Sequence, residues 1–209
     1  MPDFLFPLIA FAAGSVPFGL LVGLARGVDI RQRGSGNIGA TNVFRVVGAF
    51  WGVLVFLFDF LKGVGPVVLL RIYGPEGAAE GVWGVATALG AILGHNYSPW
   101  IGFKGGKGVA TSAGALLALF PWALLAGVVV WVVVLKVTRY VSVASMTAAV
   151  AVPVAVAVQA QVTGDWRASH LGFALLIALL SVWRHRSNIR NLRAGREHRI
   201  GRDAPEPRL

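Results

Sequence analysis

Glycine, serine, asparagine and arginine are concentrated in the stretch RQRGSGNIGATNVFR, residues 31–45. Gly34, Gly36 and Gly39 match the G-x-G-x-x-G spacing of dinucleotide-binding turns, but that fold needs a preceding strand and an acidic residue about 20 positions further on. Here the preceding segment is apolar, and Asp59 lies inside another apolar run. The stretch therefore predicts a different kind of anion-binding loop, in which backbone N–H groups converge on phosphate. The side chains that would add donors are Ser35, Asn37, Thr41, Asn42 and Arg45. A tight turn at the membrane interface is the alternative interpretation.

A second polar stretch, GHNYSPWIGFKGGKGVATSAGA, covers residues 94–115. Its FKGGKG core resembles a P-loop but lacks the required spacing and the Ser/Thr after the lysine. It nevertheless places lysines and glycines just before an apolar helix, whose N-terminal N–H groups favour anions. We therefore expect a second anion site near the end of the preceding apolar segment. Its candidate residues are His95, Asn96, Lys104, Gly105, Gly106, Lys107 and Gly108.

The third polar stretch, RHRSNIRNLRAGREHRI, covers residues 184–200. A basic helix lying against anionic lipid is the simplest interpretation. That interpretation leaves Asn188 and Glu197 unexplained, so we include them with His185 among the candidate site residues.

Other kinds of chemistry are not indicated by the sequence. The chain contains no cysteine, and its 4 histidines show no metal-ligand spacing. We find no Ser-His-Asp pattern, and we expect neither a metal nor a cofactor. Asp59 and Lys62 are charged residues inside an apolar run, where charges are costly and usually paired. The sequence does not distinguish a structural ion pair from support of a site.

The elements that must position these residues are membrane helices. The chain of 209 residues is 56% hydrophobic and only 13% charged, about half the charged fraction of soluble domains. We predict an all-α polytopic membrane protein with about seven transmembrane helices, some of them short or broken. The apolar segments are 4–25, 47–73, 81–94, 108–120, 122–135, 141–162 and 168–183. The pair within 108–135 is either two short spans or a re-entrant pair.

The basic residues set the expected orientation. Of the 19 lysines and arginines, all except Lys62, Arg71 and Arg167 fall on connections on one side of the membrane. All three polar stretches lie on that same side. The positive-inside rule assigns that side to the cytoplasm. We expect the N-terminus outside, with residues 4–25 retained as a helix, and the C-terminus in the cytoplasm. The net charge of +10 is therefore assigned to membrane topology and not to nucleic-acid binding. Residues 1–200 are expected to form one transmembrane domain, followed by a disordered tail at 201–209.

Together, GSGNIGATNVFR, GHNYSPWIGFKGGKGVAT and HRSNIRNLRAGRE resemble, in order and spacing, the three cytoplasmic motifs of the bacterial acyl-phosphate:glycerol-3-phosphate acyltransferase family. SVPFG at 15–19 and DFLKG at 59–63 are also similar to that family. The resemblance implies a multi-pass enzyme of the bacterial inner membrane whose active site faces the cytoplasm. It implies acyl transfer from acyl phosphate to the 1-hydroxyl of glycerol 3-phosphate, the first step of phospholipid synthesis, giving lysophosphatidic acid and phosphate. The enzyme that makes acyl phosphate is then a candidate partner.

The same resemblance implies roles for individual residues. Ser35, Arg45, Lys104, His185 and Asn188 would form the catalytic or phosphate-contacting centre, and Glu197 would orient the third stretch. The 104–108 loop would hold glycerol 3-phosphate, and the 35–41 stretch would hold the acyl-phosphate head or the developing oxyanion. The general base stays open. A transporter of a phosphorylated solute or lipid is the alternative function, since broken helices with anion-binding ends are also transporter features.

Overall fold

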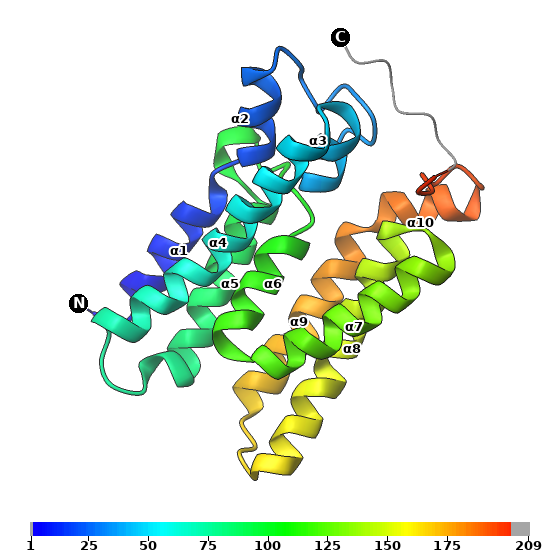
Figure 1. The fold of residues 1–209 in the computed structure, drawn as a ribbon. Helices are drawn as coiled ribbons and strands as arrows, with labels where there is room; N and C mark the ends of the chain where they lie inside the picture. Colours follow the sequence, from blue (N-terminus) through cyan, green and yellow to red (C-terminus); the bar gives the residue numbers. More distant parts are fainter. Residues whose placement is uncertain (1, 202–209) are drawn as a thin grey trace. The chain divides into compact units, whose positions relative to one another are not determined.

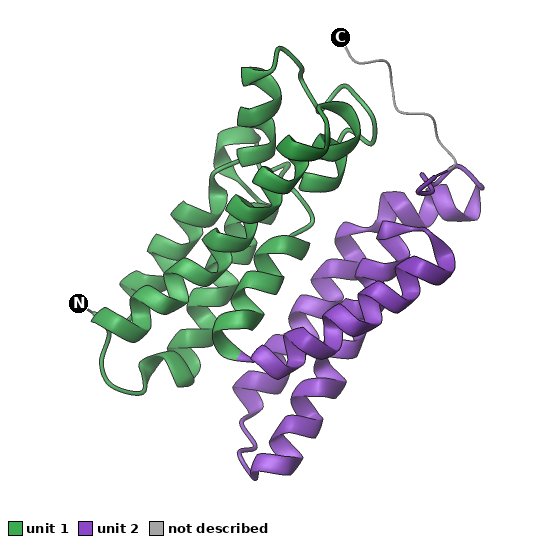
Figure 2. Cartoon of the chain, viewed as in Figure 1, with its two compact units in different colours: residues 1–119, 205–209 green, residues 120–204 purple. Residues whose placement is uncertain are grey.

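The computed structural model describes residues 2–201, and this part of the chain is helical with no β-strand (Figure 1). The chain divides into two compact units, with the boundary between Leu119 and Phe120 (Figure 2). The first unit contains α1 (Leu5–Ser15), α2 (Phe18–Ala25), α3 (Ala40–Val46), α4 (Ala49–Tyr73), η1 (Ala78–Glu80), α5 (Val82–Asn96), η2 (Pro99–Ile101) and α6 (Val109–Leu119). The second contains α7 (Pro121–Thr138), α8 (Val141–Thr163), α9 (Ala168–Arg184) and α10 (Arg186–Arg193).

Small residues allow the helices of the first unit to pack closely. A Cβ added at Gly90 or Gly94 of α5 would overlap the backbone of α1, and one at Gly14 of α1 would overlap the backbone of α5. Gly63 of α4 and Gly114 of α6 make the same close approach to each other's helices. Membrane helices associate mainly through such packing, because lipid offers no hydrophobic driving force between them.

The predicted helix over 4–25 is interrupted in the structure. Val16 is extended, with φ −60° and ψ 117°, and α2 starts after Pro17. Proline lacks the N–H that would continue the helix and disfavours helical geometry in the residue before it, which explains the break. The carbonyls left open at the end of α1 find side-chain donors, since Ser98 Oγ donates to Ser15 O at 2.6 Å and Lys62 Nζ donates to Val16 O at 2.9 Å.

In the second unit, α8 packs against both α7 and α9. Trp131 Nε1 of α7 donates to Ser145 Oγ of α8 at 3.1 Å. The last two helices, α9 and α10, meet at a bend of 51°. The unit is thus a three-helix bundle that ends in a bent basic segment.

Each predicted apolar segment contains a helix, which confirms the all-α membrane fold class. Four helical segments are long and apolar enough to cross a membrane, or five if the bent pair α9–α10 is one span. The helix predicted over 122–135 is longer than expected, because α7 continues to Thr138 and includes Lys136 in its last turn. A cation is favourable there, beside the negative end of the helix dipole. The number of spans and their orientation stay predictions, and residues 202–209 of the predicted tail lie outside the described residues.

Candidate active site

The first glycine-rich stretch is shaped by one buried amide, that of Asn42 on α3. Asn42 Oδ1 accepts the backbone N–H of Ser35 at 2.9 Å, while Nδ2 donates to Ile30 O at 3.0 Å and Arg33 O at 3.2 Å. The residue is 2% exposed. All of these bonds are made to the loop that precedes α3, so Asn42 holds the shape of that loop.

The glycines of this loop serve its turns. Gly34 and Gly36 have φ of 57° and 68°, a backbone conformation that residues other than glycine rarely adopt. The Gly36 N–H donates to Arg33 O and the Gly39 N–H to Asn37 Oδ1, both at 2.9 Å. Because these amides and that of Ser35 are used within the loop, side chains are the better candidates for binding a ligand here.

The arginines near this loop differ in their surroundings. The Arg31 guanidinium makes a paired contact with Asp29, with Nη2 2.8 Å from Oδ2, and this hydrogen bonding lowers the pKa of the half-buried Asp29 carboxyl. Arg31 is therefore held by its own loop. Arg45 lies half-buried in the last turn of α3, while Ser35 and Thr41 are exposed.

The first two polar stretches meet at one end of the first unit. Ile30 and Ile38 of the first loop are buried in an apolar cluster with Val43 and Val55, and Ile101 of the second stretch packs against that cluster. Trp100 Nε1 also donates to Ser15 Oγ at 2.9 Å, beside the break in the first helical segment. Tertiary packing thus brings together two loops that are about 60 residues apart in the sequence.

The second glycine loop lies directly on the end of α5. The Gly105 N–H donates to Asn96 O at 3.2 Å, and the Gly106 N–H donates to His95 O at 3.1 Å. A Cβ at Gly106 would overlap His95 Nε2, and one at Gly108 would lie 2.7 Å from Asn96 Oδ1. Only glycine permits this approach, so the loop is built around these two polar side chains.

Asn96 has an unusual environment in this loop. It is 1% exposed, and within residues 2–201 neither its Oδ1 nor its Nδ2 has a hydrogen-bond partner. Gly108, which its amide faces, immediately precedes the first turn of α6. Buried polar groups are rarely left unpaired, so this amide beside a helix N-terminus is a candidate for binding a ligand. Lys104 is exposed and Lys107 half-buried on the same loop.

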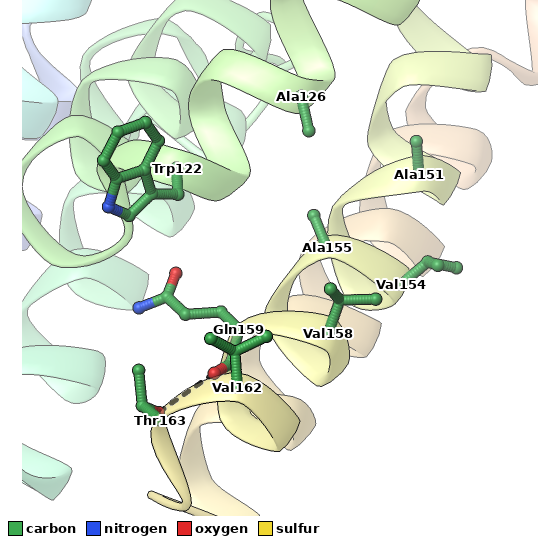
Figure 3. Close-up of a pocket in the computed structure, with 9 residues that line it drawn as sticks. All are labelled: Trp122, Ala126, Ala151, Val154, Ala155, Val158, Gln159, Val162 and Thr163. Atoms are coloured by element: carbon green, nitrogen blue, oxygen red, sulfur yellow. Dashed lines mark hydrogen bonds between the residues drawn. The ribbon is translucent and has the colours of Figure 1, made fainter.

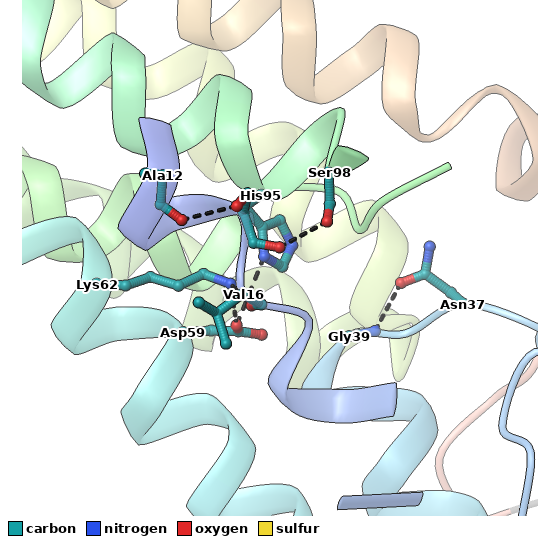
Figure 4. A network of polar contacts seen from close by, with 9 residues as sticks. Ala12, Val16, Asn37, Gly39, Asp59, Lys62, His95 and Ser98 are labelled. Atoms are coloured by element: carbon teal, nitrogen blue, oxygen red, sulfur yellow. Dashed lines mark hydrogen bonds and ion pairs between the residues drawn. The ribbon is translucent and has the colours of Figure 1, made fainter. Parts of the chain in front are cut away.

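An ion network lies beneath this loop (Figure 4). Asp59 Oδ1 is 2.7 Å from Lys62 Nζ and 3.5 Å from His95 Nδ1. All three residues are buried. The two charges that sequence analysis located inside an apolar run are therefore paired, and the pair contacts a candidate site residue.

In the second unit, the third stretch forms the bend between α9 and α10. His185 lies at the bend, 2% exposed, with Nδ1 2.8 Å from Ser181 O. A carbonyl only accepts, so Nδ1 carries a proton. This hydrogen bond fixes the orientation of the ring at the bend.

Glu197 connects three parts of this unit. Its Oε1 accepts Asn188 Nδ2 at 2.7 Å and Ser142 Oγ of α8 at 2.6 Å. The Ile200 N–H further donates to Arg139 O at 2.9 Å, which ties the segment after α10 to the α7–α8 connection. This geometry supports an orienting role for Glu197 toward Asn188.

Sequence reasoning missed Ser142, and for Lys62 it left a structural ion pair and support of a site as open alternatives. Ser142 sits in an apolar run with no local signal, and its partner is 55 positions away. The charge of Lys62 was a signal, but its bond to Val16 O, 46 positions away, depends on the unpredicted break at Pro17.

An open apolar groove of about 690 Å³ also lies along α7 and α8 (Figure 3). It is lined by Trp122, Ala126, Ala151, Val154, Ala155, Val158, Gln159, Val162 and Thr163. None of these side chains is an acid or a base near neutral pH, and the Thr163 hydroxyl donates to Gln159 O at 2.9 Å. Among the described residues, no three histidine or acidic side chains form a group that could hold a metal ion.

Comparison with known proteins identifies the family of this chain. Residues 4–195 match the family model described as glycerol-3-phosphate acyltransferase. The glycerol-3-phosphate acyltransferase of Geobacter sulfurreducens is 43% identical over 192 residues, covering 92% of this chain and 94% of that protein. The enzyme of the same name from Geotalea daltonii is 45% identical over 190 residues, covering 90% and 93%.

A solved structure agrees in fold as well. The crystal structure of PlsY, an integral membrane glycerol 3-phosphate acyltransferase in its glycerol 3-phosphate form, is 40% identical with a TM-score of 0.86. The similarity covers 95% of this chain and 96% of that one. A membrane-helix fold and nearly full-length similarity to these enzymes lead to one conclusion: the chain belongs to the glycerol-3-phosphate acyltransferase family.

Proposed function

We propose that the protein transfers a fatty acyl group from acyl phosphate to the 1-hydroxyl of glycerol 3-phosphate, giving lysophosphatidic acid and inorganic phosphate. The observation that carries the proposal is the loop at 104–108, at the start of α6, which bears two lysines and faces the buried Asn96 amide. That amide has no hydrogen-bond partner among the described residues. The related crystal structures are described as glycerol 3-phosphate and lysophosphatidic acid forms, which are a substrate and a product of this reaction.

The chemistry suits an enzyme that positions its substrates. Acyl phosphate is a mixed anhydride and already activated. The substrate hydroxyl oxygen forms a bond to the acyl carbon, and the bond from that carbon to the phosphate oxygen breaks. Phosphate leaves with the electron pair, and the hydroxyl proton passes to phosphate or to a protein base. No covalent enzyme intermediate is required, so the main contributions are orientation and electrostatic stabilisation.

The roles that we propose for individual residues are those that the resemblance to the family suggests. In the first unit, Asn96, Gly108 and the lysines of the second loop would bind the phosphate of glycerol 3-phosphate, and Ser35 and Arg45 would bind the acyl-phosphate head. In the second unit, His185 and Asn188 would contact phosphate, with Glu197 holding Asn188 in place. We further propose that the enzyme lies in a bacterial inner membrane with these loops in the cytoplasm, supplied by an enzyme that makes acyl phosphate.

A comparison of acyl donors tests the proposal. Purified protein is supplied with glycerol 3-phosphate and with acyl phosphate, acyl-CoA or acyl-carrier protein, while phosphate release and lysophosphatidate formation are followed. We expect product only with acyl phosphate. Product from acyl-CoA would retain the acyltransferase but contradict the donor. Binding of glycerol 3-phosphate with no product from any donor would favour a transporter.

A further inference from the structure

Asp59 and Lys62 have no part in the proposed reaction, yet they form the most deeply buried ion pair among the described residues. Their side chains are 3% and 4% exposed, with Lys62 Nζ 2.7 Å from Asp59 Oδ1. Two further contacts extend from this pair, one from each residue.

The contact made by Lys62 reaches the break in the first helical segment. Its Nζ donates to Val16 O at 2.9 Å, where α1 ends before Pro17 (Figure 4). A cation at the C-terminal end of a helix satisfies an open carbonyl and the negative end of the helix dipole. The helix that follows the break, α2, leads directly into the first glycine loop, so Lys62 fixes the start of the segment that carries that loop.

The contact made by Asp59 reaches the second glycine loop through His95. The Asp59 carboxylate lies 3.5 Å from His95 Nδ1. The opposite ring nitrogen, Nε2, is against Gly106, and the His95 carbonyl accepts the Gly106 N–H at 3.1 Å. Any movement of His95 would therefore displace the loop.

We propose that Asp59 and Lys62 are positioning residues that hold the two glycine loops in a fixed mutual arrangement. Lys62 acts through the α1–α2 break, and Asp59 acts through His95. The assignment rests on the proposed function for its effect on substrate binding, but the arrangement of the loops can be measured without turnover.

The test must separate positioning from simple stabilisation. Asp59→Asn alone would leave the Lys62 ammonium buried without its counter-charge, which is strongly destabilising. The variant of choice is therefore the double substitution Asp59→Asn/Lys62→Met, which removes both charges at similar volume. The matched control is Arg71→Met/Glu80→Gln, which neutralises an exposed pair between α4 and η1, with Nε and Oε1 3.0 Å apart.

Two measurements decide the outcome. The first is hydrogen exchange of residues 102–108 in the purified protein. We expect the Gly105 and Gly106 amides to exchange about tenfold faster in the double variant, because their acceptors on α5 are less well fixed. The second is KM for glycerol 3-phosphate, which should rise about tenfold with kcat changed less than about threefold, the pattern of lost uniform binding. The control variant should match the wild type in both.

Unchanged exchange and unchanged KM in a folded double variant would overturn the proposal and leave the enzyme function intact. The exchange of residues 102–108 could be faster in the double variant while the wild type yields no product from any donor. That result would contradict the proposed function and retain the positioning role. A variant that loses thermal stability but keeps wild-type exchange in 102–108 would show a purely structural ion pair.

Discussion

The amide of Asn42 shows that a polar side chain in a glycine-rich stretch can bond to its own loop. Its position among glycines suggested a donor to a ligand, but its hydrogen bonds go to Ser35, Ile30 and Arg33 within its own loop. Asn96 shows the opposite case, since its buried amide has no partner in the described chain. Sequence indicates which residues are polar, whereas only the folded backbone shows which of them are already bonded.

The loop-shaping role of Asn42 can be tested by truncation. Asn42→Ala removes one acceptor and two donors and leaves the Ser35 N–H and the carbonyls of Ile30 and Arg33 without their partner. The Ile30 carbonyl is buried, and an unpaired buried group costs about 1–3 kcal/mol, so we expect a clear fall in the thermal midpoint of the purified protein. The control is Asn191→Ala on α10, a half-buried asparagine outside the candidate site. Equal midpoints for the two variants would contradict the role of Asn42.

Lys104 is a candidate of a different kind, since its ammonium is exposed and has no hydrogen-bond or ion-pair partner within residues 2–201. Lys104→Ala should reduce turnover about 10²–10³-fold without loss of fold, the usual effect of removing one group that stabilises developing charge. Lys104→Arg should also be impaired, because a planar guanidinium fork does not replace a compact ammonium. The exposed Lys136 on α7 provides the control, as Lys136→Ala should keep wild-type turnover. Near-normal turnover of the purified Lys104→Ala variant would remove this residue from the site.

At the scale of elements, glycines of the membrane helices fall into two groups. Gly94 of α5 faces the backbone of α1, where a Cβ would overlap Phe11 O, whereas a Cβ at Gly65 of α4 would meet nothing within 4 Å. The same substitution should therefore have opposite effects at the two positions. We expect helix packing to determine the effect on stability at Gly94, and helix propensity to determine it at Gly65.

Gly94→Ala should force α1 and α5 apart and lower the thermal midpoint and the yield of folded protein. Gly65→Ala should be neutral or stabilising by up to about 1 kcal/mol, because alanine favours a helix more than glycine does. Thermal unfolding in detergent, followed by the fluorescence of the native tryptophans, measures both. If Gly94→Ala were as stable as Gly65→Ala, close packing of α1 on α5 would not be needed for the fold.

Most of the helices were predictable from the sequence, because long runs of apolar residues indicate membrane-spanning helices. The break at Val16–Pro17 was not predicted, although its proline was visible, because the surrounding residues are uniformly apolar. Helix α3 was also missed, since its sequence ATNVFRV is short and polar at its start and is stabilised by packing of Val43 in a buried cluster. For the site, the sequence indicated the three stretches, but the bonds of Glu197 to Ser142 and Asn188 depend on tertiary contacts that local patterns do not encode.

At the scale of the whole molecule, the distribution of charge makes a prediction about topology. The connections at 26–39, 97–108, 139–140 and the segment after Arg184 are rich in lysine and arginine, and should face the cytoplasm. The connections at 74–81 and 164–167 should face outside. The connection between α6 and α7 distinguishes two spans from a re-entrant pair, because α6 has only 11 residues.

Because the chain has no cysteine, single introduced cysteines can report this topology without background. We expect a membrane-impermeant maleimide applied to intact cells to label exposed Glu76→Cys and Asp165→Cys, and to leave Gln32→Cys and Ala194→Cys unlabelled until the membrane is opened. The reverse pattern would invert the orientation and place the glycine loops outside. Trp122 is exposed at the start of α7, so Trp122→Cys tests whether α6 and α7 are two spans or a re-entrant pair. Labelling from outside would show that α6 and α7 each cross the membrane, whereas protection from outside, with Glu76→Cys labelled in parallel, would show a re-entrant pair.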